Sequence, residues 1–322
     1  MSGLQKTVVV VGATGKQGSS VVQEFLQKPL EYRVRGLTRD PNSSKAKALS
    51  EQGVEVVQAD ANDFASLSNA FQGAHVIYAM TDFWQAMSFD VEYEQGKAMA
   101  DIAAGLPQLE HLVWAGLPDG RAISEGRYTH IYHWQSKAAV TDYIRESKPD
   151  LWARTTVILF PNYFENCTTN PRSYLPVKQS DGVYVRSFPL PADTPLPNVS
   201  IADTGKLVYQ VVTHNTEYYK RTIAFYSQAI SEGAKLEVLS KHHGIPVRYE
   251  QISELQFRTA LEAHMPPITA LDFTEQLMLF DGCGMIYDRP EFVQANQIEG
   301  LELKTWETYV KGEDLLSHME SA

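Results

Sequence analysis

This chain of 322 residues has little cysteine and no long apolar run, and each shortage excludes a class of protein. Its two cysteines, Cys167 and Cys283, lie far apart, which fits a reducing compartment and excludes a disulfide framework. No apolar run approaches the roughly 20 residues of a membrane span. A strand pattern begins within six residues of Met1, which leaves no room for a signal peptide. We therefore expect a cytoplasmic protein without a membrane anchor.

Positive charge is also scarce. The chain has 28 Lys and Arg against 39 Asp and Glu, for a net charge of −11. This balance argues against direct nucleic-acid binding, because neutralising phosphates requires clustered Lys and Arg. A small anionic ligand stays compatible, since one local Arg can bind it. No internal repeat or low-complexity tract occurs, and 43% hydrophobic and 21% charged residues are ordinary for a globular protein.

What the sequence does contain is a glycine-rich turn near its start. The apolar run Val8–Val11 leads into Gly12, Gly15 and Gly18, and a helical pattern follows at 21–27. A strand that is apolar on both faces is typical of a covered parallel sheet. Glycines at its end let the backbone approach a pyrophosphate held by the next helix's N–H groups, although the spacing is GxxGxxG rather than GxGxxG. This turn predicts cofactor contacts from Gly12, Thr14, Gly15, Lys16, Gln17 and Gly18.

The first half of the chain alternates strand and helix patterns with short connections. Strands are expected at 7–11, 32–37, 54–58, 75–79, 111–115 and 152–159. Helices are expected between them at 19–27, 43–52, 64–71, 89–104 and 130–146. Such alternation is typical of an α/β fold, here a doubly wound parallel Rossmann sheet. We assign residues 1–160 to this cofactor-binding domain.

The sequence pattern changes after residue 160. Loops are expected around Pro171, Pro176, Pro189, Pro191, Pro195 and Pro197, with a strand at 182–188. Further helices are expected at 203–213, 231–243, 253–263, 268–280 and 304–311, and strands at 222–226 and 246–251. We assign 161–322 to a smaller mixed α/β C-terminal domain that covers the substrate or a partner, some of whose segments could return to the Rossmann sheet.

Cofactor choice depends on the end of the second strand, Thr38-Arg39-Asp40. In a Rossmann unit an acidic residue here binds a ribose 2′-hydroxyl, whereas an Arg accommodates a 2′-phosphate. Arg39 therefore favours NADP(H) over NAD(H). Asp40 could instead serve a 2′-hydroxyl or cap the next helix, and the two could form a plain surface pair. Asp60, with Ala61 beside it, either lies near the adenine or caps a helix.

Two further segments follow strands whose ends meet at one edge of the sheet. After the fourth strand, Met80 and Thr81 are expected along the second ribose. Phe83 and Trp84 would wall a planar substrate or the nicotinamide, or pack their loop. After the sixth strand, contacts with the nicotinamide or substrate are expected from Pro161, Asn162, Tyr163 and Phe164. Asp203 is read as a helix cap.

The helix after the fifth strand carries the candidate catalytic residues. Lys137 could hydrogen-bond the nicotinamide ribose, and His133, four residues earlier, projects on the same face. A His that titrates near neutrality could donate a proton to a reduced substrate. Trp134 is a candidate substrate contact. Alternatively the histidines pack the helix start and Lys137 is a solvated charge. His130 and His133 lack a third ligand at metal-like spacing, so no metal is expected.

Together these residues resemble the NmrA-like group of atypical short-chain dehydrogenases/reductases. The resemblance is carried by Gly12–Gly18, Thr38–Pro41, His133 with Lys137, Pro161–Asn166 and Ile201–Gly205. It implies a Rossmann domain, a smaller C-terminal domain and NADP(H) binding. Some relatives are redox-sensing regulators that bind the dinucleotide without turnover and control another protein. Others, including isoflavone-reductase-like and fungal biosynthetic members, are reductases.

The chain departs from ordinary short-chain dehydrogenases at one position. Those enzymes carry Tyr four residues before the active-site Lys, where this chain has His133, with Tyr132 one residue off. Hydride transfer does not require that Tyr, because the cofactor carries the chemistry. We therefore expect an NADPH-dependent reductase of a small C=O, C=N or C=C substrate, of the kind found in fungal secondary metabolism. The alternative is an NADP(H)-sensing regulator that binds a protein partner and could act in the nucleus.

Overall fold

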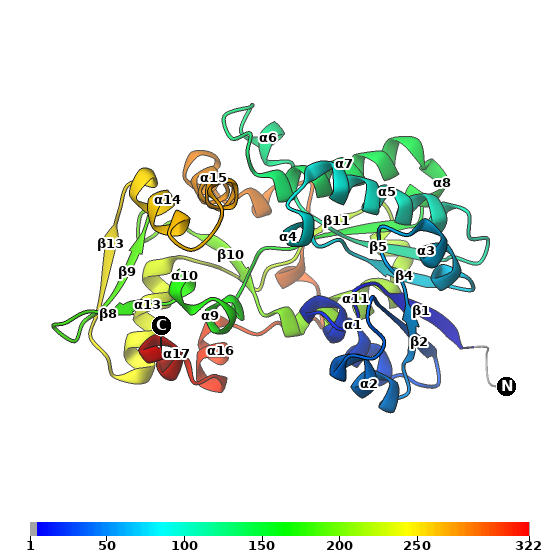
Figure 1. Cartoon of the computed structure of the whole chain (residues 1–322), viewed down its shortest axis with the longest axis horizontal. Helices are drawn as coiled ribbons and strands as arrows, with labels where there is room; N and C mark the ends of the chain where they lie inside the picture. Colours follow the sequence, from blue (N-terminus) through cyan, green and yellow to red (C-terminus); the bar gives the residue numbers. More distant parts are fainter. Residues whose placement is uncertain (1–4, 322) are drawn as a thin grey trace.

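Eight parallel strands form the centre of the structure, a computed structural model that describes residues 5–321. Their order is β14-β11-β6-β5-β4-β1-β2-β3, which contains the Rossmann order 3-2-1-4-5-6. The six expected strands are β1 Lys6–Val10, β2 Tyr32–Thr38, β3 Glu55–Gln58, β4 Val76–Ala79, β5 His111–Gly116 and β6 Thr155–Leu159. The doubly wound parallel sheet is confirmed (Figure 1).

Helices cover both faces of this sheet. In Figure 1 α3 (Phe64–Phe71), α5 (Phe89–Ala104) and α7 (Tyr132–Ser147) lie above it. On the opposite face lie α1 (Lys16–Leu26), α2 (Ser44–Glu51) and α11 (Thr204–Thr213). Side-chain oxygens cap the starts of α2, α3 and α5, from Ser43, Asp63 and Ser88 respectively.

The sixth strand starts later than the sequence pattern predicts. Residues 149–152 form a short helix, α8 (Pro149–Trp152), so the strand begins at Thr155. Proline is favoured in the first turn of a helix because its missing N–H has no partner there anyway. Two other single-turn helices, α4 (Phe83–Ala86) and α6 (Gly120–Ile123), lie in segments where no helix was expected.

A second lobe is built around two small sheets, of order β12-β10-β7 and β13-β9-β8. Their strands are β7 Asn162–Tyr163, β8 Val177–Lys178, β9 Tyr184–Phe188, β10 Leu196–Val199, β12 Gln228–Ile230 and β13 Val247–Gln251. Its helices are α9 Asn166–Thr169, α10 Pro171–Tyr174, α13 Glu232–His243, α14 Glu254–Glu262, α15 Pro267–Cys283, α16 Trp306–Gly312 and α17 Leu315–Ser321. The short helix α12 (Asn215–Tyr218) belongs with the large sheet, where it follows α11.

The chain crosses between the lobes several times. After residue 160 it returns to the large sheet as β11 (Thr222–Ala224), which pairs with β6, and as β14 (Val293–Gln294), which pairs with β11. Helix α11 packs on α1, where Gly205 lies against the Ser20 backbone. The main apolar core therefore contains residues from both halves of the sequence.

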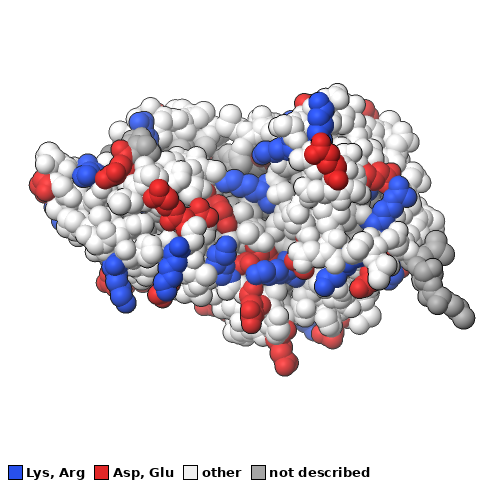
Figure 2. Space-filling model, turned by 90° about the horizontal axis from the view of Figure 1, so that it is seen from below, with Lys and Arg blue, Asp and Glu red and all other residues white. Residues whose placement is uncertain are grey.

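Within residues 5–321, no helix combines the length and apolar character needed to cross a lipid bilayer. Acidic and basic side chains alternate over the face shown in Figure 2, without a broad basic region among the atoms coloured there.

Candidate functional site

The predicted site residues converge where the strand order reverses. Strand β1 lies between β2 and β4, so the glycine turn after β1 faces the segment after β4. Ligands of open α/β sheets bind at this point. Two adjoining clefts open here, of about 450 and 490 Å³. We call them the turn cleft and the His133 cleft; both are lined by Gly15, Lys16, Gln17, Met80, Thr81 and Asp82.

Each of the three glycines has a different structural consequence of lacking a side chain. Gly12 has φ +68°, a left-handed conformation that favours glycine. A β-carbon on Gly18 would lie 2.2 Å from the Gly12 carbonyl oxygen, so only glycine lets the helix approach the turn. A β-carbon on Gly15 would meet only that same oxygen, at 3.2 Å. Gly15 is thus the glycine whose side-chain space faces the clefts.

The start of α1 fits a phosphate group. Its N-cap is Gly15, and no side chain caps the helix among the described residues. Uncapped N–H groups at a helix start bind anions, and the helix dipole adds to that preference. The Lys16 ammonium lies beside this turn and donates to the Thr169 hydroxyl at 3.1 Å. Burial lowers the pKa of Lys16, an effect that Glu165 opposes.

Arg39 lies at the far end of the turn cleft, which Ser43 and Lys45 also line. Its guanidinium donates to Gln85 Oε1 at 2.5 Å. The Asp40 carboxylate accepts from the Asn42 N–H, and Ser43 caps α2, so Asp40 supports the turn rather than the helix start. Asp60 likewise accepts from the Asn62 N–H, while Asp63 caps α3. The cleft lining here contains the cations of Arg39 and Lys45, the hydroxyls of Thr38 and Ser43, and the carboxylates of Asp40 and Asp60.

Gln17 connects the glycine turn to the segment after β6. Its amide donates to the Tyr163 hydroxyl at 2.6 Å and accepts from the Tyr78 hydroxyl at 2.9 Å. Burial raises the pKa of both tyrosines above the ordinary range, so both hydroxyls keep their protons. Pro161, Asn162 and Tyr163 all line the His133 cleft.

Phe164 is the predicted cofactor contact that lies elsewhere. Its ring is 1% exposed and packs on Trp306 and Tyr309 in the core of the second lobe. Backbone alternation explains the correction, because neighbouring residues of an extended segment point to opposite sides. Glu165 is also structural, since its carboxylate accepts from the Ser200 hydroxyl and the Ile201 N–H.

Asp203 occupies the N-cap position of α11 without capping it. Its carboxylate accepts from the Lys304 N–H at 2.6 Å and pairs with Lys206. The residue joins α11 to the segment before α16, which corrects its reading as a helix cap.

Lys137 lines the His133 cleft, and its ammonium already contacts three oxygens. It pairs with the Glu92 carboxylate at 2.5 Å and donates to the Thr81 carbonyl and hydroxyl at 2.8 and 2.7 Å. Glu92 is buried and also accepts from the Thr81 and Ser136 hydroxyls. An ammonium has three N–H donors, so Lys137 here fixes the segment after β4.

His133 forms a second buried pair. Its Nδ1 lies 2.5 Å from Oδ1 of Asp272 on α15, and its backbone N–H donates to Oδ2 of the same carboxylate. Asp272 is 1% exposed. A carboxylate beside Nδ1 favours a proton on that nitrogen, and Nε2 is the ring nitrogen that this pair does not engage. His130, one turn earlier, pairs in the same way with Glu275 at 2.6 Å, outside the cleft lining.

Aromatic rings surround His133. Trp84 stacks on Phe273 with centroids 5.0 Å apart, and its ring lies 4.9 Å from His133. Trp84 is 40% exposed, whereas Phe83 and Trp134 are buried in the cleft wall. Such a wall suits a planar ligand. Among residues 5–321, no cluster of His, Cys, Asp or Glu could hold a metal ion.

The sequence pattern does not reveal the contributions of the C-terminal half. Asp272, Phe273 and Gln276 on α15, together with Asn170 and Tyr174, line or support the His133 cleft. Asp272 lies 139 residues after His133. A helix pattern at 268–280 was visible, but nothing local in it indicates that its polar residues face a distant histidine.

Comparisons with known proteins agree with this geometry. The chain is 27% identical over 267 residues to the NmrA-like family domain-containing oxidoreductase ptmS of Penicillium ochrochloron, covering 78% of this chain and 77% of that protein. Crystallised NmrA, a negative transcriptional regulator, in complex with NAD, superposes with a TM-score of 0.73 at 18% identity, covering 99% and 98% of the two chains.

A reductase has the same fold. The complex of leucoanthocyanidin reductase from Vitis vinifera with NADPH has a TM-score of 0.72 at 16% identity, covering 95% of this chain and 98% of that one. NmrA has also been crystallised with NADP. The sequence profile of the NmrA-like family matches residues 4–310, nearly the whole chain. This protein therefore belongs to the NmrA-like family.

Proposed function

We propose that this protein is an NADP(H)-dependent reductase that acts on a small C=O, C=N or C=C substrate. The observation that carries the proposal is the buried pair of His133 and Asp272 at the edge of an aromatic-walled cleft. A binding module would have no need of a carboxylate that orients a histidine ring towards its ligand. Relatives such as ptmS, named an oxidoreductase, and the leucoanthocyanidin reductase support this class.

The two clefts together would hold the cofactor. The glycine turn and the start of α1 suit the pyrophosphate, and Arg39 with Lys45 suits a 2′-phosphate, which favours NADP(H) over NAD(H). Met80, Thr81 and Asn162 lie where the second ribose and nicotinamide are expected. When bound, NADPH supplies a hydride. The chain's task is to hold the two reactants together and to supply a proton.

His133 is the proposed proton donor. The Asp272 carboxylate lies 2.5 Å from Nδ1 and would balance the positive charge of the protonated ring, so Nε2–H is the proton that would go to the substrate. As the substrate gains a hydride, its developing negative charge takes the Nε2 proton, and the ring ends neutral. Solvent then returns a proton to Nε2. Positioned acids of this kind contribute about 10²- to 10⁴-fold.

Lys137 is assigned a positioning role. Its contacts with Glu92 and with the Thr81 carbonyl hold the segment on which the ribose would lie. A direct hydrogen bond from Lys137 to the ribose would require the exchange of one of its three contacts, with Glu92, the Thr81 carbonyl or the Thr81 hydroxyl.

One observation favours the alternative of an NADP(H)-sensing regulator with a protein partner. All three Lys137 donors are engaged by the protein, and the Tyr of ordinary short-chain dehydrogenases is absent. The fold of NmrA, a transcriptional regulator, is also shared. A sensor must bind its partner differently with NADPH and with NADP+, since only differential affinity shifts a population.

Turnover separates the two candidates. Purified protein with NADPH is challenged with quinones, enones, aldehydes and cyclic imines, and NADPH oxidation is followed at 340 nm. A reductase consumes NADPH with at least one class, and His133→Ala lowers kcat by about 10²-fold with little change in NADPH affinity. The sensor is supported instead if no compound of the panel is turned over and if a protein partner binds with an affinity that depends on the redox state of the cofactor.

The chain offers a matched control for His133. His130→Ala removes a similar His–carboxylate contact with α15, made from the segment just before α7 by a side chain outside the cleft lining. We expect this variant to keep kcat near wild type. Equal losses in both variants would mean that the α7–α15 contact, and not proton donation, is what the activity requires.

A further inference from the structure

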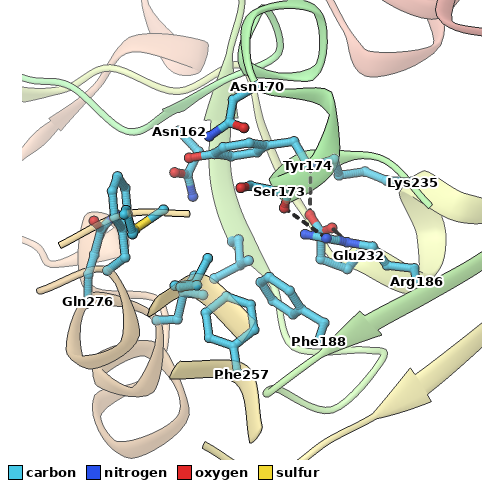
Figure 3. Close-up of a pocket in the computed structure, with 15 residues that line it drawn as sticks. Asn162, Asn170, Ser173, Tyr174, Arg186, Phe188, Glu232, Lys235, Phe257 and Gln276 are labelled. Carbon is cyan, nitrogen blue, oxygen red and sulfur yellow. Dashed lines mark hydrogen bonds and ion pairs between the residues drawn. The ribbon is translucent and has the colours of Figure 1, made fainter. Parts of the chain in front are cut away.

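The His133 cleft does not end at the aromatic wall. It adjoins a smaller chamber of about 50 Å³, and both are lined by Asn162, Asn170, Tyr174, Phe273 and Gln276. One water needs roughly 10–15 Å³ of such space, so the chamber has room for a small end group rather than a second molecule. Figure 3 shows Gln276 on one side of the chamber and Arg186, Glu232 and Lys235 on the other.

Most of the chamber wall is apolar. Two aromatic rings, Phe188 and Phe257, stand edge to face with centroids 5.6 Å apart. Aliphatic side chains complete the wall, from Leu196, Leu261, Met265 and Leu277. The Arg186 guanidinium lies 4.6 Å from the Phe188 ring centroid. The residues shared with the cleft are uncharged, whereas Arg186, Glu232 and Lys235 line the chamber alone, so a group that enters from the cleft meets uncharged side chains before charged ones (Figure 3).

The charged end contains two cations and one anion. Arg186 Nε lies 2.8 Å from one Glu232 carboxylate oxygen, and Lys235 Nζ lies 2.6 Å from the other. All three side chains are at most 8% exposed. Burial alone would raise the pKa of Glu232, but Lys235 and Arg186 hold it down to about 2. The cluster thus keeps one buried positive charge without a counter-charge of its own.

The donors of this cluster are only partly used. Arg186 donates to Glu232 and to the Ser173 carbonyl, which accounts for two of five guanidinium N–H groups. Lys235 donates to Glu232 and lies over the Trp306 ring. Tyr174 stands where chamber and cleft meet, and burial raises its pKa to about 12, so its hydroxyl stays a donor.

We propose that this chamber binds the terminal carboxylate of an elongated, mostly apolar substrate, with Arg186 as the principal contact. The inference rests on the proposed function, since the far end of the same molecule would carry the C=O, C=N or C=C group beside His133. Arg186 and Lys235 share the single carboxylate of Glu232, and the one excess positive charge is costly to bury; a substrate carboxylate would neutralise it through charge-assisted bonds. Nothing in the sequence pattern singles out Arg186, Glu232 or Lys235.

Two probes that differ only at one end test the assignment. 4-Formylcinnamate carries a carboxylate at the end opposite its aldehyde, and its methyl ester does not. Binding of each to the NADP+ complex is measured by calorimetry, and kcat/KM with NADPH is measured where turnover occurs. We expect wild type to prefer the acid over the ester by at least about tenfold, the size of one charge-assisted hydrogen bond.

Variants of the cluster are expected to change the preference for the acid over the ester in opposite directions. Arg186→Met leaves the Glu232–Lys235 pair balanced, and should remove the preference for the acid while ester binding is kept. Glu232→Gln leaves two cations, and should keep or raise that preference. Lys235→Met leaves the balanced pair of Arg186 and Glu232, so it repeats the first test if Arg186→Met does not fold. A purely structural cluster would instead weaken both ligands alike in every variant.

The outcomes separate this inference from the proposed function. Preferred binding of the acid without NADPH oxidation would support the chamber and count against the reductase. Turnover without an acid preference, or an unchanged preference in Arg186→Met and Lys235→Met, would overturn the chamber alone. Absence of acid binding at millimolar concentration would also overturn it.

Discussion

The role of each residue in the glycine turn depends on its local contacts, and so do the roles of the residues around the clefts. Gly12, Thr14, Gly15, Lys16, Gln17 and Gly18 all line the turn cleft, as do Arg39, Asp60, Ala61, Met80 and Thr81. The residue type and the place after a strand were enough to predict this. Phe164 was misplaced, because the sequence pattern does not show which side of an extended segment faces the ligand.

A substitution at Gly15 tests whether the glycine turn binds the cofactor. Its backbone has φ −83°, which any residue adopts, and an added β-carbon meets only the Gly12 carbonyl oxygen. Gly15→Val should therefore fold normally but lose dinucleotide binding, as followed by calorimetry and thermal unfolding. Gly18→Ala should differ, since its β-carbon collides with the backbone and lowers stability. Normal NADPH affinity in Gly15→Val would contradict cofactor binding by the turn.

Arg39 tests cofactor choice. A charge-assisted contact with the 2′-phosphate is worth about 1.5–3 kcal/mol, so Arg39→Ala should weaken NADPH about 10- to 150-fold and NADH much less. Calorimetric titration of both cofactors measures the difference. Arg33→Ala is the control, because Arg33 is an exposed residue of β2, the strand before Arg39, and pairs with Glu55 away from the cleft. Equal losses for both cofactors would contradict the assignment.

At the scale of helices and strands, the alternating pattern of the first half predicted every strand from β1 to β6 and every long helix between them. Parallel strands buried on both faces, such as β5 and β6, make strong local signals. Single-turn helices such as α4 were missed because four residues carry too little periodicity. The partnership of α7 with α15 was missed because it depends on tertiary packing across 139 residues.

The contact of α1 with α11 fixes the chain's return to the sheet, and Gly205 makes it possible. A β-carbon there would lie 2.2 Å from the Ser20 carbonyl oxygen. Gly205→Ala should destabilise the protein by about 1–3 kcal/mol, the usual cost of overpacking, measured by urea unfolding. Gly312→Ala is the control, since a β-carbon at Gly312 meets no atom within 4 Å among the described residues. Unchanged stability in Gly205→Ala would mean that the two helices are not held this closely.

At the scale of the whole molecule, the two lobes meet along a continuous path from Arg39, past His133, to Arg186. The first part of this path was predictable, because glycine turns and strand ends have recognisable spacing. The second part was not, since Arg186, Glu232 and Asp272 are ordinary polar residues until the fold buries them. The division into a cofactor region and a covering region stays a prediction.

The buried cluster also predicts how stability depends on pH. Glu232 has a folded-state pKa of about 2, below its ordinary 4.5. Its stabilising contribution is therefore complete above pH 4.5 and is lost as the pH falls towards 2. Wild type should lose more unfolding free energy over this range than Glu232→Gln, as measured by urea unfolding at several pH values. Parallel curves for the two proteins would contradict an ionised Glu232 in the folded state.

The central claim is that hydride leaves NADPH for a substrate beside His133, and isotope transfer tests it most directly. Purified protein is incubated with NADPH deuterated at C4 of the nicotinamide, on one face and then on the other, and with a substrate from the panel. The account predicts a product that contains one deuterium from one of the two cofactors, in wild type and in His130→Ala, with much slower transfer in His133→Ala. Products without deuterium from either cofactor, across the whole panel, would contradict it.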